Sequence, residues 1–182
     1  MSDEERSIGG KKFRSVGTVN EILTRWGIPR RYLQARLLST ENPDNDYYIH
    51  GPVGSGKTYY LCGLLRRQDG LEDCMFITFD DMLDNLKKGF NQGESIMDLA
   101  LSRYKEVPVL ALDDIGAGLV TDWVKAVLYQ IINYRYNQLL RTYVSSNFSI
   151  TELGELFDFR VASRLGQMCE IIRLSGDRRL SE

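Results

Sequence analysis

The sequence has few cysteines and no long apolar run. Its three cysteines, Cys62, Cys74 and Cys169, are odd in number, far apart and in no CxxC spacing. This argues against a disulfide framework and against a zinc site. No apolar run approaches the roughly 20 residues that span a membrane, and the N-terminus MSDEERSIGGKK has no signal-peptide core. These absences predict a cytoplasmic protein in a reducing compartment, without a membrane partner.

An excess of charge of one sign is also missing. The chain has 23 basic and 25 acidic residues, a formal net charge of -2, so any surface for nucleic acid must be local. The single histidine, His50, has no partner at metal-ligand spacing, and a structural role is expected. A chain of 182 residues with 43% hydrophobic residues is long enough for one substantial core.

Short apolar segments alternate with helical segments through most of the chain. Predicted strands cover 46–50, 74–79, 107–113, 142–147 and 170–174. Predicted helices cover 57–68, 80–88, 94–106, 121–140 and 160–169, and we expect Thr121 and Asp80 to cap two of them. Such alternation predicts an α/β fold with a five-stranded, mostly parallel sheet covered on both faces.

The N-terminal part is expected to differ from the rest. Residues 1–26 are predicted to be a flexible lead-in, because the N-terminal stretch is polar and contains glycine. The segment VNEILTRWG (19–27) favours a short helix. Residues 27–182 are expected to form one domain.

The segment GPVGSGKT follows the first predicted strand and precedes a predicted helix. Its pattern is that of a P-loop, in which glycines let successive backbone N–H groups point at phosphate oxygens. Lys57 is expected to reach the β- and γ-phosphates, and the Thr58 hydroxyl to bind Mg²⁺. The nucleotide-binding residues predicted here are Gly51, Pro52, Val53, Gly54, Ser55, Gly56, Lys57, Thr58 and Tyr59.

Two adjacent acids end the apolar run VLALDDIG. In P-loop proteins an acid at a second strand end holds the water shell of Mg²⁺, and Asp113 is expected to do so. Asp114 is then expected to orient or deprotonate an attacking water, which points to hydrolysis. Asn147 ends the strand TYVSSN and is expected to hydrogen-bond that water or the γ-phosphate, although a turn residue is the common alternative.

The segment FRVASRLG places Arg160 and Arg164 four residues apart, on one face of a predicted helix. A guanidinium can neutralise charge on a transferring phosphoryl group, in cis or from a neighbouring subunit. Spacing alone favours two solvated arginines.

With these motifs in order, the chain resembles AAA+ ATPases of the bacterial helicase-loader group, the DnaC/DnaI-like proteins, with IstB-like transposition helpers as near relatives. The resemblance covers about residues 27–179 and is carried by GIPRRY, GPVGSGKT, LALDDIG, VSSNFSI, RVASRL and RLSGDRR. It implies a P-loop NTPase three-layer sandwich without a separate lid domain, with ATP and Mg²⁺ as cofactors.

The resemblance also implies roles for individual residues. GIPRRY resembles the segment beside the adenine, which implies weaker nucleotide contacts from Ile28, Pro29 and Arg30 to Tyr32.

Three further matches lie towards the C-terminus. SSN resembles the sensor I strand end, at Asn147. RVASRL resembles the segment that carries the trans-acting arginine finger, best mapped to Arg164 with Arg160 beside it, and this role requires self-association through the ATP sites. SGDRR resembles the second sensor, at Arg178 followed by Arg179.

Partners are implied in the same way. The resemblance implies a DNA-replication accessory that loads or remodels a replicative helicase on single-stranded DNA. Loaders usually carry a separate helicase-gripping domain, whereas only 26 residues precede Gly27 here, and this is a departure from the pattern of the group. Candidate contacts to single-stranded DNA are Tyr134, Arg135, Tyr136, Arg141, Arg66, Arg67, Lys87 and Lys88.

Two alternatives belong to other functional classes. A transposition helper of the IstB type is expected to prefer duplex DNA and to bind a transposase. A small-molecule kinase needs lid arginines and an acceptor pocket, and the paired acids with Asn147 and Arg164 argue against it. Most AAA+ proteins have glutamate in the place of Asp114, and the shorter aspartate predicts a slow ATPase that is stimulated by assembly or DNA.

Overall fold

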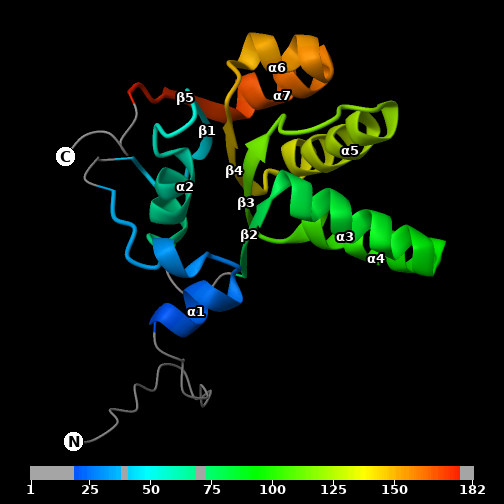
Figure 1. Cartoon of the computed structure of the whole chain (residues 1–182), viewed down its shortest axis with the longest axis horizontal. Helices are drawn as coiled ribbons and strands as arrows, with labels where there is room; N and C mark the ends of the chain where they lie inside the picture. The colour runs from blue at the N-terminus through cyan, green and yellow to red at the C-terminus, as the bar shows by residue number, and fades with distance from the viewer. Residues whose placement is uncertain (1–18, 38–40, 69–72, 177–182) are drawn as a thin grey trace, which may run out of the picture.

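The computed structural model describes residues 19–37, 41–68 and 73–176 (Figure 1). One sheet of five parallel strands runs through its centre, in the order β2-β3-β4-β1-β5. The strands are β1 (Asp46–His50), β2 (Cys74–Thr78), β3 (Val109–Ile115), β4 (Arg141–Ser146) and β5 (Cys169–Arg173). The predicted strands and their parallel arrangement are confirmed, with small shifts of their ends.

Helices cover both faces of this sheet, as predicted. They are α1 (Val19–Arg25), the 3-10 turn η1 (Arg30–Tyr32), α2 (Lys57–Leu65), α3 (Phe79–Gln92), α4 (Glu94–Glu106), α5 (Asp122–Gln138), α6 (Ile150–Leu156) and α7 (Phe159–Met168). Helix α1 is the short helix expected near the N-terminus. Within the described ranges, no helix is both long enough and apolar enough to cross a membrane.

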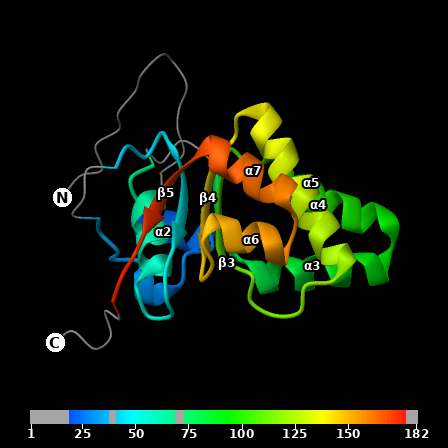
Figure 2. The same ribbon diagram turned by 90° about the horizontal axis from the view of Figure 1, so that it is seen from above.

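The helices form two unequal outer layers. Figures 1 and 2 show α1 and α2 on one face of the sheet and α3 to α7 on the other. Because side chains alternate along a strand, Tyr47 and Ile49 of β1 pack on the α2 side while Tyr48 packs on the other. Leu23 and Trp26, in and after α1, are buried in the same core as α2.

The helix caps differ in part from expectation. Thr121 caps α5, because its hydroxyl accepts a hydrogen bond from the Val124 N–H, as predicted. The expected cap of α3 was Asp80, and this is wrong. Thr78 caps that helix and accepts from the Asp81 N–H at 3.1 Å. Thr78 ends β2 with extended dihedral angles, which an N-cap needs.

Helix α6 was not predicted from the sequence. Ser149 and Glu152 form a complete capping box in which each side chain binds the other residue's backbone N–H. The S-x-x-E spacing in SITE is the sequence signal for such a helix start.

Arg135 is not available for nucleic acid, which corrects one predicted contact. Its side chain is fully buried. The guanidinium donates to the backbone carbonyls of Val107 and Arg141 at 2.8 and 2.5 Å, and to the Thr142 hydroxyl at 2.9 Å. Because these acceptors belong to the β3 lead-in and the start of β4, Arg135 joins α5 to the sheet.

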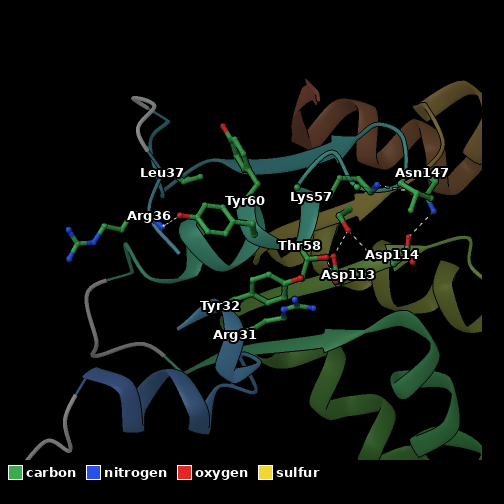
Figure 3. Close-up of a pocket in the computed structure, with 15 residues that line it drawn as sticks. Arg31, Tyr32, Arg36, Leu37, Lys57, Thr58, Tyr60, Asp113, Asp114 and Asn147 are labelled. Atoms are coloured by element: carbon green, nitrogen blue, oxygen red, sulfur yellow. Dashed lines mark hydrogen bonds between the residues drawn. The ribbon is translucent and has the colours of Figure 1, made fainter. Parts of the chain in front are cut away.

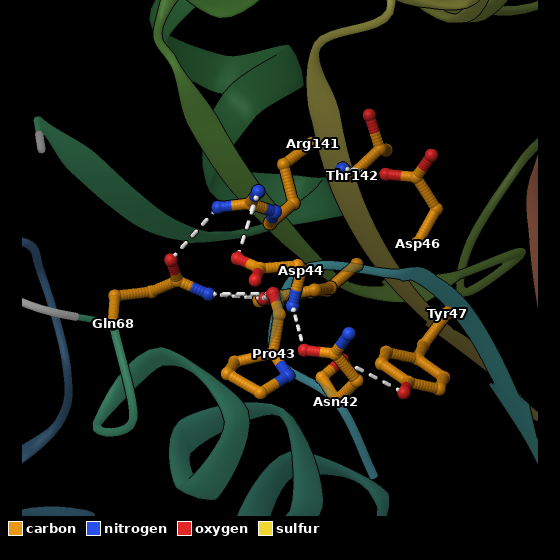
Figure 4. Close-up of polar contacts among 9 residues, drawn as sticks. Asn42, Pro43, Asp44, Asp46, Tyr47, Gln68, Arg141 and Thr142 are labelled. Atoms are coloured by element: carbon orange, nitrogen blue, oxygen red, sulfur yellow. Dashed lines mark hydrogen bonds and ion pairs between the residues drawn. The ribbon is translucent and has the colours of Figure 1, made fainter.

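Arg141 lies at the amino ends of the strands (Figure 4). It pairs with Asp44 at 3.1 Å and donates to the Gln68 side chain at 3.0 Å. Gln68 in turn donates to the Pro43 carbonyl at 2.9 Å. These contacts tie the segment before β1 to the sheet.

The other predicted DNA contacts have mixed surroundings. Arg67 donates to the carbonyls of Glu41 and Leu37, at 2.9 and 3.0 Å, and Arg66 donates to the Leu33 carbonyl. Lys87 and Lys88 are exposed on α3. The arginines therefore hold the chain that precedes β1, while the two lysines remain accessible.

Candidate nucleotide-binding site

A cavity of about 840 Å³ opens at the carboxyl ends of β1, β3 and β4 (Figure 3). Ligands of open parallel sheets bind at this edge, and the volume is within the usual range for small-molecule sites. The lining residues are Arg31, Tyr32, Arg36, Leu37, Val53, Gly54, Gly56, Lys57, Thr58, Tyr59, Tyr60, Asp113, Asp114, Ser145 and Asn147.

Most of the predicted nucleotide-binding residues line this cavity, and six do not. Gly51, Pro52 and Ser55 lie within the loop without lining it. In the segment GIPRRY, Arg31 and Tyr32 line the cavity, whereas Ile28, Pro29 and Arg30 do not. Arg178 and Arg179 lie outside the described residues. Sequence reasoning did not assign Arg36, Leu37 or Tyr60 to the site.

The phosphate loop depends on left-handed backbone at two glycines. Gly54 and Gly56 have φ values of 85° and 93°, which residues with a Cβ rarely adopt. The turn at Gly56 leads directly into α2, whose first residues Lys57 and Thr58 line the cavity, so the positive end of the helix dipole lies at the cavity. The Ser55 hydroxyl is buried, and the described part of the chain offers it no hydrogen-bond partner. An acceptor oxygen of a bound phosphate fits this position.

Lys57 is buried at the base of the loop, with 8% of its surface exposed. Its ammonium group donates to the carbonyls of Gly51 and Pro52, both at 2.9 Å, and to the Asn147 side-chain oxygen at 2.7 Å. Because β1 and β4 are neighbours in the sheet, the loop that follows β1 brings Lys57 beside Asn147 at the polar end of β4.

Asp113 lies at the centre of the cavity wall and is almost fully buried. The Thr58 hydroxyl donates to one carboxylate oxygen at 2.8 Å, and the Ser145 hydroxyl donates to the other at 2.5 Å. Burial raises the pKa of Asp113, while these two hydrogen bonds oppose the shift. Oxygen ligands from one carboxylate and one hydroxyl suit Mg²⁺, which usually retains water and substrate phosphates as its other ligands.

Asp114 lies beside Asp113 and has a separate set of contacts. Its carboxylate accepts from the Asn147 amide at 3.1 Å, and its backbone N–H donates to the Ser145 hydroxyl at 2.9 Å. Asn147 therefore bridges Lys57 and Asp114. The three groups expected to surround the terminal phosphate and an attacking water are thus linked by hydrogen bonds through Asn147.

The opposite end of the cavity combines aromatic and apolar side chains with two arginines, Arg31 and Arg36. The Arg31 guanidinium lies 5.6 Å from the centre of the Tyr32 ring. The Tyr59 hydroxyl accepts from the Arg36 backbone N–H at 3.0 Å, and Leu37 also lines this end. A planar base can stack against such a surface.

Arg164 and Arg160 do not line the cavity of their own chain. The Arg164 guanidinium donates to the Asn133 side chain at 2.7 Å and lies 5.0 Å from the centre of the Tyr129 ring. Arg160 pairs with Asp158 at 2.7 Å and also lies over Tyr129. Both arginines are therefore held on the outer surface formed by α5 and α7.

Comparison with known families agrees with this site. The model of the family described as "IstB-like ATP binding protein" matches residues 12–179. The chain belongs to this family. As an IstB-like ATP-binding protein, it has its phosphate loop, paired acids and sheet edge within the matched region.

Two curated relatives come from Bacillus subtilis. The replicative helicase loader DnaI is 31% identical over 146 residues, which cover 72% of this chain and 46% of DnaI. The phage-like element PBSX protein XkdC is 26% identical over 173 residues, which cover 90% of this chain and 62% of XkdC. This IstB-like protein thus spans about half the length of the curated relatives it matches.

Solved structures support the fold. The crystal structure of DnaI superposes with a TM-score of 0.68 at 25% identity, covering 81% of this chain and 94% of that one. The DnaC helicase loader gives a TM-score of 0.69 at 24% identity, covering 81% of this chain and all of that one. The expected relation to the helicase-loader group and the expected AAA+ fold are both confirmed.

Proposed function

We propose that this IstB-like protein is a Mg²⁺-dependent ATPase and a replication accessory that loads or remodels a replicative helicase on single-stranded DNA. The observation that supports it most is the division of contacts at the cavity wall. Asp113 binds Thr58 and Asp114 binds Asn147, so the two acids serve different parts of one site.

The chemistry follows from this division. Thr58 and Asp113 would hold Mg²⁺, which neutralises phosphate charge when bound. Lys57 would bind the terminal phosphates. Asp114, oriented by Asn147, would position the attacking water and accept its proton.

The proposed partners rest on the relatives. DnaI is a replicative helicase loader, and its similarity covers 72% of this chain. The proposal therefore includes a replicative helicase and single-stranded DNA as partners, self-association through the ATP sites, and a cytoplasmic location.

The direct test is ATP hydrolysis by the purified protein, with and without single-stranded DNA and the replicative helicase of the source organism. We expect slow phosphate release that rises with either partner. The matched control is Lys57→Ala, which should bind nucleotide weakly and release no phosphate. Absence of hydrolysis under all conditions, or transfer of phosphate to a small acceptor, would contradict the proposed function.

A second function is favoured by the family match itself, because its model is built on IstB-like proteins. A transposition helper should bind duplex DNA in preference to single strands. Competition between the two DNA forms at several salt concentrations separates the two roles, since binding through phosphate contacts weakens steeply with salt. Preference for duplex DNA, together with no capture of the helicase, would favour transposition.

A further inference from the structure

The two acids occupy an irregularity in the sheet. Where strands β3 and β4 run side by side, Leu112 pairs with Val144, and the next pair along the strands is Ile115 with Ser146. Two residues of β3, Asp113 and Asp114, therefore lie opposite Ser145 alone. Two residues facing one is the definition of a β-bulge, and bulges commonly re-aim side chains beside active sites.

This bulge decides where both carboxylates point. In a regular strand, consecutive side chains lie on opposite faces, so two adjacent acids would be directed away from each other. Here Asp113 contacts Thr58 of the phosphate loop, Asp114 contacts Asn147, and both acids line the cavity. The bulge is thus where the two acids take up neighbouring places in one cavity.

The bulge also explains the choice of aspartate at position 114. Asp114 has a φ of 59°, in the left-handed region. Among residues with a Cβ, aspartate and asparagine are enriched there several-fold, because their short polar side chains bond locally. A glutamate at this position would lack that advantage.

One hydroxyl group holds both acids in this geometry. Ser145 is fully buried. Its hydroxyl donates to the Asp113 carboxylate at 2.5 Å and accepts the Asp114 backbone N–H at 2.9 Å. It thus fixes one carboxylate directly and the other through the backbone, and it satisfies an N–H that the bulge takes out of the strand ladder.

We infer that Ser145 is a positioning residue. Its hydroxyl holds the β-bulge in its observed geometry and so fixes the positions of Asp113, the proposed metal ligand, and Asp114, which is proposed to bind the attacking water. This inference rests on the proposed ATPase function. Ser145 is expected to act through Asp113 and Asp114, so its removal should affect Mg²⁺ use and turnover more than nucleotide affinity.

The test compares Ser145→Ala with a matched control, Ser146→Ala. Ser146 is the next residue of β4, is also fully buried, and its hydroxyl donates to the Ile115 carbonyl at 2.6 Å. Each variant loses one buried hydroxyl and its hydrogen bonds, but only Ser145 contacts the acids. Thermal unfolding of both variants measures the shared structural cost.

Three readouts are needed. Binding of a fluorescent ATP analogue in EDTA should be unchanged in Ser145→Ala, because the phosphate loop is intact. The Mg²⁺ concentration that gives half-maximal enhancement of binding should rise roughly 10–100-fold, as is typical when a residue that orients a metal ligand is removed. The kcat should fall by a similar factor with little change in KM, and Ser146→Ala should match the wild type in all three.

Conservative variants keep the inference testable if Ser145→Ala does not fold. Ser145→Thr retains the hydroxyl and should restore Mg²⁺ dependence, while Ser145→Cys, with a weaker donor and acceptor, should fall between the wild type and alanine. The inference is overturned if Ser145→Cys has the Mg²⁺ dependence of the wild type, or if Ser145→Ala and Ser146→Ala behave alike. A wild type that binds ATP but hydrolyses none contradicts the proposed function, and the Mg²⁺-dependent binding still decides the role of Ser145.

Discussion

At the scale of single residues, Asp113 and Asp114 are neighbours in sequence with different surroundings. Asp113 is buried between two hydroxyl groups, whereas Asp114 is partly exposed and bound by an amide. A buried carboxylate with fixed donors suits a metal, and a more accessible one suits a water molecule.

Separate substitutions should separate these roles. We expect Asp114→Asn to retain Mg²⁺-dependent ATP binding and to lower kcat by roughly 10²- to 10⁴-fold, the usual contribution of a general base. Asp113→Asn should instead remove the effect of Mg²⁺ on binding. Equilibrium binding and phosphate release measure the two effects. If hydrolysis survived Asp114→Asn unchanged and was abolished by Asp113→Asn, this division of roles would be wrong.

Arg135 is the second residue whose role depends on its surroundings. Burial lowers its pKa to about 10, with Asp46 opposing the shift, so it remains charged at neutral pH. Its hydrogen bonds to main-chain carbonyls offset the cost of burying that charge.

Replacing Arg135 should therefore destabilise the protein without touching the nucleotide site. We expect Arg135→Met to lower the free energy of unfolding by roughly 3 kcal/mol, because several buried carbonyls lose their donor. Lys88→Met, on the exposed face of α3, is the control and should change stability by about 0.5 kcal/mol or less. Urea unfolding measures both. Equal losses in the two variants would mean that the Arg135 hydrogen bonds contribute nothing net.

At the scale of elements, short helices depend on their ends. Helix α6 has seven residues, too few to be stable alone, and it joins the end of β4 to α7 next to Asn147. Its capping box and the packing of Leu153 in the core hold it in place.

Removing the cap should measure this dependence. We expect Ser149→Ala to lower the free energy of unfolding by about 1 kcal/mol, since the N–H of Glu152 loses its acceptor. Ser163→Ala, exposed in the middle of α7, serves as the control because alanine is favoured in helix interiors. Thermal unfolding of both variants gives the comparison. A Ser149→Ala protein as stable as the control would show that packing alone fixes α6.

At the scale of the whole molecule, Arg164 lies away from the cavity of its own chain. Among the described residues, the two arginines that line the cavity are Arg31 and Arg36, both in the segment before β1. Arg164 lies on another surface, where it contacts Asn133 of α5. An arginine that acts on the terminal phosphate from α7 must therefore come from a neighbouring copy.

Mixing two inactive variants tests this arrangement. Arg164→Ala keeps an intact ATP site, and Asp114→Asn keeps an intact Arg164, so mixed assemblies contain some complete sites. We expect each variant alone to hydrolyse ATP poorly and their mixture to recover part of the wild-type rate, measured as phosphate release against mixing ratio. Activity that is the plain sum of the two variants would exclude a role for Arg164 in trans.

Much of the fold could be predicted because its signals are local in the sequence. The phosphate loop needs glycines and a lysine at fixed spacing, and apolar segments of strand length gave the five strands. Helix α6 was missed although its S-x-x-E signal was present. Arg135 was misjudged because a charged residue is expected at the surface, and only the packed structure brings the carbonyls around it.

The sequence by itself determined that two acids end one strand after a phosphate loop, and hence the nucleotide-binding class of the protein. It could not determine how both acids face one cavity, because regular alternation along a strand would direct them to opposite faces of the sheet. The tertiary structure decided that point. In the folded chain Ser145, on a strand distant in sequence, accepts the Asp114 N–H and donates to the Asp113 carboxylate at the bulge.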